Sequence, residues 1–153
     1  MIVVSDTSPL TALLTVGKAE LLVQLFGEVL IPQEVEKELL RSSTALPSWL
    51  RVQPVRDTAK ARLYALGLDR GEAEAIALAE ELGADHLLMD ERKGRRFAIQ
   101  RGLPVLGLLG VLLIAKRKGL IPSARSLLLR LDQEAGIYLG NDLRESALKT
   151  VGE

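Results

Sequence analysis

Short runs of apolar, often β-branched residues alternate along the chain with longer segments whose apolar residues recur at helical spacing. The short runs predict strands at 2–4, 29–31, 86–89 and 104–106, and a weaker strand at 50–55, where Pro54 indicates an edge position. The longer segments predict helices at 10–26 (divided at Gly17), 33–40, 58–66, 70–82, 91–100, 111–118 and 123–131, and a last helix from an Asn141 cap to 148. This alternation predicts an α/β fold, with a parallel sheet covered by helices on both faces.

The composition excludes several classes of function. A chain of 153 residues suits one domain, which we expect to span 1–153, and the lack of cysteine rules out disulfides, thiol nucleophiles and zinc–thiolate sites. The only histidine, His86, begins a predicted strand, far from the sheet edge where ligands bind, which favours a structural role. With 20 basic and 20 acidic residues, the chain has no net positive charge with which to bind polyanions in general. Any contact with nucleic acid must therefore come from a local basic patch.

Neither a targeting segment nor a membrane span is predicted. The first residues lack the basic and apolar regions of a signal peptide. The longest apolar segment, Leu103–Ala115, contains Pro104 and two glycines, and it is shorter than the roughly 20 residues that a membrane helix needs. We therefore expect a cytoplasmic protein that does not enter a membrane.

Two aspartates occupy equivalent places at the ends of predicted strands. Asp6 follows the apolar run 2–4, and Asp90 follows the run 86–89. The carboxyl ends of parallel strands lie at one edge of the sheet, where open α/β sheets bind ligands. Aspartate is also a common helix N-cap, and this structural role is the favoured explanation for either residue taken by itself.

Two glutamates lie in the predicted helices. Glu38 is about two turns into the helix at 33–40, and Glu72 is near the start of the helix at 70–82. The negative charge of Glu72 is favourable at the start of a helix in itself, and Glu38 also fits a solvated helix face. Glu74 points about 200° away from Glu72 around a helix of 3.6 residues per turn, so only one of them can face a shared site. The periodicity does not choose between them.

Together these positions resemble the four acidic blocks of PIN domains, most closely those of the prokaryotic branch related to VapC toxins. The blocks are Val4–Leu10, Ile31–Leu39, Gly71–Ala79 and Leu88–Arg95, and the resemblance extends from Met1 to about Pro122. It implies a three-layer α/β/α sandwich with strand order 3-2-1-4-5 and a metal-dependent ribonuclease that hydrolyses RNA. Because this branch includes toxins of toxin–antitoxin pairs, the resemblance also implies a possible cognate antitoxin.

The resemblance places the catalytic, metal-binding acids on Asp6, Glu38, Glu72 and Asp90. Glu72 stands where VapC proteins usually have Asp, and Glu91 leaves the fourth position ambiguous between two neighbours. Thr7 and Ser8 follow the first acid, where the family often has a hydroxyl. The secondary candidates are therefore Thr7, Ser8, Glu74 and Glu91.

The donor chemistry agrees with this implication. Carboxylates without Cys or His suit hard cations, so the expected cofactor is Mg²⁺ or Mn²⁺ and not zinc. Like charges this close cannot all stay ionised without a cation between them. Such a cation can lower the pKa of a bound water and stabilise the oxygens of a phosphodiester under attack.

Basic and apolar residues after Asp90 suggest partners. The expected RNA contacts are Arg92, Lys93, Arg95 and Arg96, with Lys116–Lys118 as a second cluster, although each cation also fits an ordinary solvated face. The apolar segment Leu106–Ile114 is expected mainly in the core. It exceeds the needs of one sheet face, and the family commonly forms dimers, so we also expect a homodimer.

Two other functions remain open at this point. A receiver-like phosphoacceptor module also places acids at the carboxyl edge of a parallel sheet, but it needs paired acids by the first strand and a lysine after a later strand. Here Gly107 and Leu108 follow the strand instead. A non-catalytic binding protein with the same fold is the second alternative, and the four intact carboxylates count against it.

Overall fold

The computed structural model describes residues 1–153, and its centre is a sheet of five short strands. These are β1 (Val3–Ser5), β2 (Val29–Ile31), β3 (Leu50–Val52), β4 (His86–Leu88) and β5 (Val105–Leu106). All neighbouring strands pair in parallel, in the order β3-β2-β1-β4-β5. The α/β class, the strand order and the edge position of the strand near Val52 are thereby confirmed.

Nine helices connect and extend the strands. They are α1 (Thr7–Thr15), α2 (Glu20–Phe26), α3 (Gln33–Leu40), α4 (Thr58–Tyr64), α5 (Arg70–Leu82), α6 (Arg92–Gln100), α7 (Leu108–Arg117), α8 (Ala124–Ala135) and α9 (Asn141–Lys149). None of them is long and apolar enough to cross a membrane.

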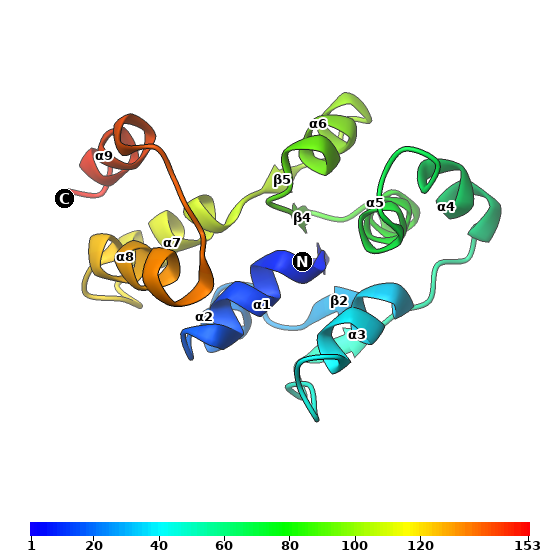
Figure 1. Cartoon of the computed structure of the whole chain (residues 1–153), viewed down its shortest axis with the longest axis horizontal. Coiled ribbons are helices and arrows are strands. Elements are labelled where there is room, and N and C mark those ends of the chain that lie inside the picture. Colours follow the sequence, from blue (N-terminus) through cyan, green and yellow to red (C-terminus); the bar gives the residue numbers. More distant parts are fainter.

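The helices form a layer on each side of the sheet. Strand side chains alternate between the two faces: Val3 and Leu88 join the core beneath α1, α2, α7 and α8, whereas Val4 and Leu87 join the core beneath α4, α5 and α6. Figure 1 shows the strands between these two groups of helices. The result is the expected α/β/α sandwich.

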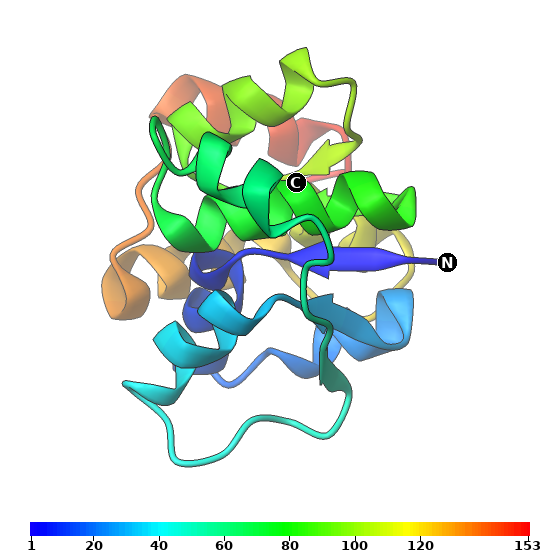
Figure 2. The same cartoon turned by 90° about the vertical axis from the view of Figure 1, so that its right-hand side faces the viewer.

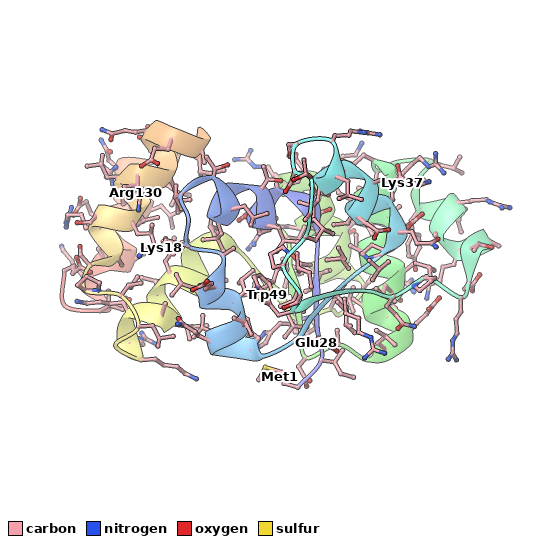
Figure 3. All side chains as sticks on the ribbon, turned by 90° about the horizontal axis from the view of Figure 1, so that it is seen from below. Met1, Lys18, Glu28, Lys37, Trp49 and Arg130 are labelled. Carbon is pink, nitrogen blue, oxygen red and sulfur yellow. The ribbon has the colours of Figure 1, made fainter.

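The carboxyl ends of all five parallel strands lie at one edge of the sheet. In Figure 2, β1 runs from the N-terminus at the right toward the left of the view, where α1 begins. Met1 and Glu28, which precede the parallel strands β1 and β2, lie together at the opposite edge, at the bottom of Figure 3. Side chains that directly follow the strands therefore meet at the edge away from Met1.

The main differences from the sequence-based prediction lie at helix ends. α7 begins at Leu108, three residues before the predicted start, and α8 continues to Ala135. The predicted cap Asn141 is wrong, because Gly140 occupies the cap position and Asn141 is the first helical residue. His86 begins β4 as predicted, and its ring lies 5.6 Å from that of Phe26 at the edge away from the strand ends.

Candidate metal site at the carboxyl edge

A cavity of about 340 Å³ opens at the carboxyl edge beside the start of α1. Its wall combines acidic side chains with the hydroxyl-bearing face of α1, and the end of α8 closes one side. The lining residues are Asp6, Thr7, Ser8, Thr11, Ala12, Thr15, Glu38, Asp69, Glu72, Glu91, Ala135 and Ile137. Five of them are carboxylates, and none is a cation.

Asp6 lies at the inner end of the cavity, directly after β1. It occupies the N-cap position of α1, but its side chain makes no capping hydrogen bond, and only 4% of the residue is exposed. Its backbone N–H donates to the carbonyl of Leu88 (2.9 Å), which ties the residue to β4. The pKa of Asp6 is raised to about 7, mainly by burial; the N–H of Thr7 opposes the shift, and the charges of Glu72, Asp69 and Glu38 add to it.

Glu38 reaches the cavity from the second turn of α3. The Thr7 hydroxyl donates a 2.6 Å hydrogen bond to its Oε2 and so fixes the carboxylate. Its Oε1 packs against Gly71, where an added Cβ would lie 2.5 Å away. The approach of α3 to α5 therefore depends on a residue without a side chain.

Glu72 enters from the start of α5, where it forms a capping box with Asp69. The Glu72 N–H donates to the Asp69 carboxylate (2.8 Å), and the Glu72 carboxylate accepts from the Asp69 N–H (3.4 Å). Burial raises the pKa of Glu72 to about 7, and Asp69 adds to the shift. Glu74 points elsewhere: it accepts the N–H of Glu34 (3.1 Å) and lines a separate hollow. Glu72 and not Glu74 therefore faces the cavity.

Asp90 is the predicted acid that the structure does not bring into this cavity. Its Oδ1 accepts the N–H of Leu108 (2.9 Å) at the start of α7, and its Oδ2 is buried without a hydrogen-bond partner. Burial raises the pKa of Asp90, while the Leu108 N–H and the charge of Arg95 lower it. The neighbouring Glu91 lines the cavity instead.

Asp69 is the lining acid that the sequence analysis missed. The sequence held a usable signal, because Asp69 and Glu72 have the spacing of a capping box, and reciprocal bonding places the two side chains together. The hydroxyls of Thr11 and Thr15 extend the cavity wall along α1 in the same way as those of Thr7 and Ser8.

The basic residues after Asp90 divide into separate groups. Arg95 is engaged internally, since its Nη1 donates to the carbonyl of Met89 (2.9 Å). Arg92, Lys93 and Arg96 are exposed on α6. The cluster Lys116–Lys118 lies at the other end of α7, eight to ten residues from the helix start beside Asp90, or about 12–15 Å at 1.5 Å per residue. None of these three residues lines the cavity.

The cavity has the chemistry of a cation site. All its charged donors are carboxylate oxygens, and the pKa values of Asp6 and Glu72 are raised mainly by burial and further by the negative charges around them. In the present side-chain positions, however, no group of three lies close enough together to hold one metal ion. The donor type therefore fits Mg²⁺ or Mn²⁺, and binding would have to draw the carboxylates together.

A comparison with protein families identifies the fold. The model of the family DUF3368, described as a PIN domain, matches residues 2–153. The chain belongs to the PIN domain family. The match extends beyond Pro122 and includes α8 and α9, which the resemblance in the sequence had not covered. No curated protein and no solved structure is similar enough to match the chain.

Proposed function

We propose that this PIN domain is a Mg²⁺- or Mn²⁺-dependent endoribonuclease that hydrolyses RNA phosphodiester bonds. The observation that carries the proposal is the gathering of five carboxylates, with no cation among them, around one cavity at the carboxyl edge. Family membership supports it, because PIN domains are generally nucleases and typically depend on a metal. Because the chain belongs to the PIN domain family, we do not retain the receiver-like alternative.

The proposed metal-binding residues are Asp6, Glu38 and Glu72, which line the cavity together. Asp90 is the proposed fourth acid, and its Oδ2 is a buried acceptor still without a partner. A bound cation would supply stabilisation of charge on the phosphodiester oxygens and easier deprotonation of the attacking water.

The side chains themselves have distinct tasks. The Thr7 hydroxyl holds Glu38 in place through its 2.6 Å hydrogen bond. The capping box with Asp69 orients Glu72 at the start of α5. With pKa values of about 7, Asp6 and Glu72 are partly protonated near neutral pH in the metal-free chain. They lose these protons when a cation binds.

A physiological role as the toxin of a toxin–antitoxin pair is the finer part of the proposal. It rests on the likeness of the four acidic blocks to those of VapC proteins. A cognate antitoxin and a second copy of the chain are the partners proposed with it. Growth arrest on induced expression, absent with Asp6→Asn, is the expected result.

A non-catalytic binding protein remains the second candidate, since no three carboxylates lie close enough together to share an ion. A purified chain that binds RNA but leaves it uncut with either Mg²⁺ or Mn²⁺ would select this candidate.

Glu72 and Glu74 provide a matched pair of variants for the test. Both lie on α5, but only Glu72 faces the cavity. We expect Glu72→Gln to weaken Mg²⁺ binding and RNA cleavage by at least about 100-fold, because removing even an outer-shell partner of a metal site typically costs 10- to 100-fold. Calorimetry with Mg²⁺ and cleavage of a labelled single-stranded RNA provide the measurements.

Glu74→Gln is the control, and it should match the wild type, because its amide oxygen can still accept the N–H of Glu34. EDTA should abolish cleavage, and added Mg²⁺ or Mn²⁺ should restore it. Equal activity of the two variants, with folding verified by circular dichroism, would sink the assignment of this cavity.

A further inference from the structure

A second hollow, which we call the α4–α6 groove, lies beside the acidic cavity. It measures about 480 Å³ and is lined by Leu63, Tyr64, Gly67, Leu68, Lys93, Arg96, Phe97 and Gln100. Figure 1 shows α4 and α6 on the same side of the sheet as α5, and both helices contact α5. The groove is thus built from the layer that covers one face of the sheet.

The charge of the α4–α6 groove is opposite to that of the cavity. Lys93 and Arg96 line it, and no acid does. Both side chains are exposed, and neither side chain makes a hydrogen bond or an ion pair within the structure. Arg101, five residues after Arg96, differs because its side chain forms an ion pair with Glu80 at 2.8 Å. Lys93 and Arg96 are therefore available for a ligand with negative charge.

The apolar wall of the groove is held in place from behind. Tyr64 and Phe97 meet edge to face, with ring centroids 4.9 Å apart, and the Tyr64 hydroxyl donates to Glu80 at 2.6 Å. Leu63 is 62% exposed at the groove, so its side chain is accessible to a ligand. A fixed apolar wall next to free cations suits a flat, apolar group that is attached to an anion.

The linings of the groove and the cavity are adjacent along the chain at two places. Leu68 lines the groove, and the next residue, Asp69, lines the cavity. In the same way Glu91 lines the cavity and Lys93, two residues later, lines the groove. This adjacency places the two hollows near each other, as neighbouring nucleotides of one chain molecule require.

We infer that the α4–α6 groove binds a nucleotide of the single-stranded RNA whose neighbouring phosphodiester occupies the acidic cavity. The base packs against Leu63, Tyr64, Leu68 and Phe97, and Lys93 and Arg96 contact the flanking phosphates. This inference rests on the proposed function, since it assigns RNA as the substrate. It explains how a neutral chain with an acidic centre attracts a polyanion.

The apolar part is tested with Leu63→Glu, which places a negative charge in the groove at an exposed position. Binding of a fluorescein-labelled single-stranded RNA of mixed sequence is measured by anisotropy in EDTA, so that cleavage does not interfere. We expect about tenfold weaker binding, the size of one lost base contact. Leu66→Glu is the matched control, because Leu66 is 84% exposed but does not line the groove, and it should bind like the wild type.

The charged part is tested with the double variant Lys93→Gln/Arg96→Gln. Its plot of log affinity against log salt should be flatter by about 1.4, at about 0.7 for each phosphate contact with single strands. The double variant Lys18→Gln/Lys149→Gln removes the same charge at two exposed positions that line neither the groove nor the cavity, and it should keep the wild-type slope.

Equal affinity of Leu63→Glu and Leu66→Glu, or equal slopes of the two double variants, would overturn the inference. So would conversion of a dimer to a monomer by Leu63→Glu at unchanged RNA affinity, since the groove would then be a contact between copies of the chain. Wild-type protein that binds RNA through the groove but cleaves none with Mg²⁺ would contradict the proposed nuclease and leave the groove assignment intact.

Discussion

The two oxygens of Asp90 have different environments. Oδ1 accepts the N–H of Leu108, and Oδ2 is buried without a partner. The hydrogen bond caps the start of α7, where Gly107 has no side chain to do so. Asp90 thus has a structural role whether or not it also binds a cation.

Comparing Asp90→Ala with Asp90→Asn isolates that structural role. Alanine removes the acceptor for Leu108, so we expect it to lower the free energy of unfolding by about 1 kcal/mol, as for other lost helix caps. Asparagine keeps an acceptor oxygen and should lose less than half of that. Urea denaturation measures both, and equal losses would show that the hydrogen bond to Leu108 does not stabilise α7.

The same pair addresses the fourth acid. In Asp90→Asn the charge is gone but the cap remains, so its Mg²⁺ affinity reports on Asp90 as a ligand alone. Because Glu91 lines the cavity, Glu91→Gln is the comparison that separates the two neighbours.

Residue patterns in the sequence could locate most of the acidic cavity but not its orientation. Asp6 was predictable because it directly follows a buried strand, and helical periodicity left Glu72 and Glu74 equivalent. The capping box with Asp69 distinguishes them, because it fixes Glu72 in the first turn of α5. The hydrogen bond from Leu108 to Asp90 spans 18 residues of sequence, and no local pattern encodes it.

At the scale of elements, α3 and α5 approach each other through Gly71. A Cβ at this position would lie 2.5 Å from Oε1 of Glu38, so Gly71→Ala must displace that carboxylate. Alanine also favours a helix by up to about 1 kcal/mol over glycine. We therefore expect a stability close to the wild type together with Mg²⁺ affinity at least about tenfold weaker, measured by calorimetry.

Gly67→Ala is the control for this variant, because nothing lies within 4 Å of its added Cβ and its backbone is unstrained. It should retain the wild-type affinity for Mg²⁺. A Gly71→Ala protein with unchanged affinity would show that Glu38 is not held at the metal site.

The strands and the order of helices followed from the sequence, because buried parallel strands and amphipathic helices have different periods. The helix ends did not follow so well. The predicted helix began at 111, after Gly107 and Gly110, but α7 begins at Leu108, since Asp90 supplies a distant acceptor. At Gly110 an added Cβ would meet Leu106 at 2.6 Å, so this glycine serves close packing inside the helix.

At the scale of the molecule, a chain with no net charge separates its charges by function. Five carboxylates surround the cavity, and the free cations Lys93 and Arg96 line the adjacent groove. The acids at the carboxyl edge are disfavoured in their charged form mainly by burial and further by one another, and a bound cation would offset their negative charge. The stability of the metal-free protein should therefore depend on pH through the buried acids.

The direction of that dependence follows from raised pKa values. Asp6 and Glu72 have pKa values of about 7 in the fold, against 3.8 and 4.5 as ordinary values, so the folded state holds more protons than the unfolded chain between these limits. Their stabilising contribution is complete below about pH 4 and is lost as the pH rises through 7. For Asp6 alone the shift corresponds to on the order of 4 kcal/mol, at about 1.4 kcal/mol per pKa unit.

We accordingly expect the free energy of unfolding in EDTA to fall between pH 5 and pH 8. Saturating Mg²⁺ should restore most of this loss at pH 8, because a cation that binds only the folded state stabilises it by mass action. Asp6→Asn has no charge to lose at this position, so in EDTA at pH 8 it should be more stable than the wild type and less sensitive to pH. Urea denaturation at four pH values, with and without Mg²⁺, tests all three expectations. Identical pH profiles for Asp6→Asn and the wild type would mean that Asp6 is not the carboxylate whose ionisation destabilises the fold. The negative charge that a cation must offset would then lie with Glu72 and its partner Asp69.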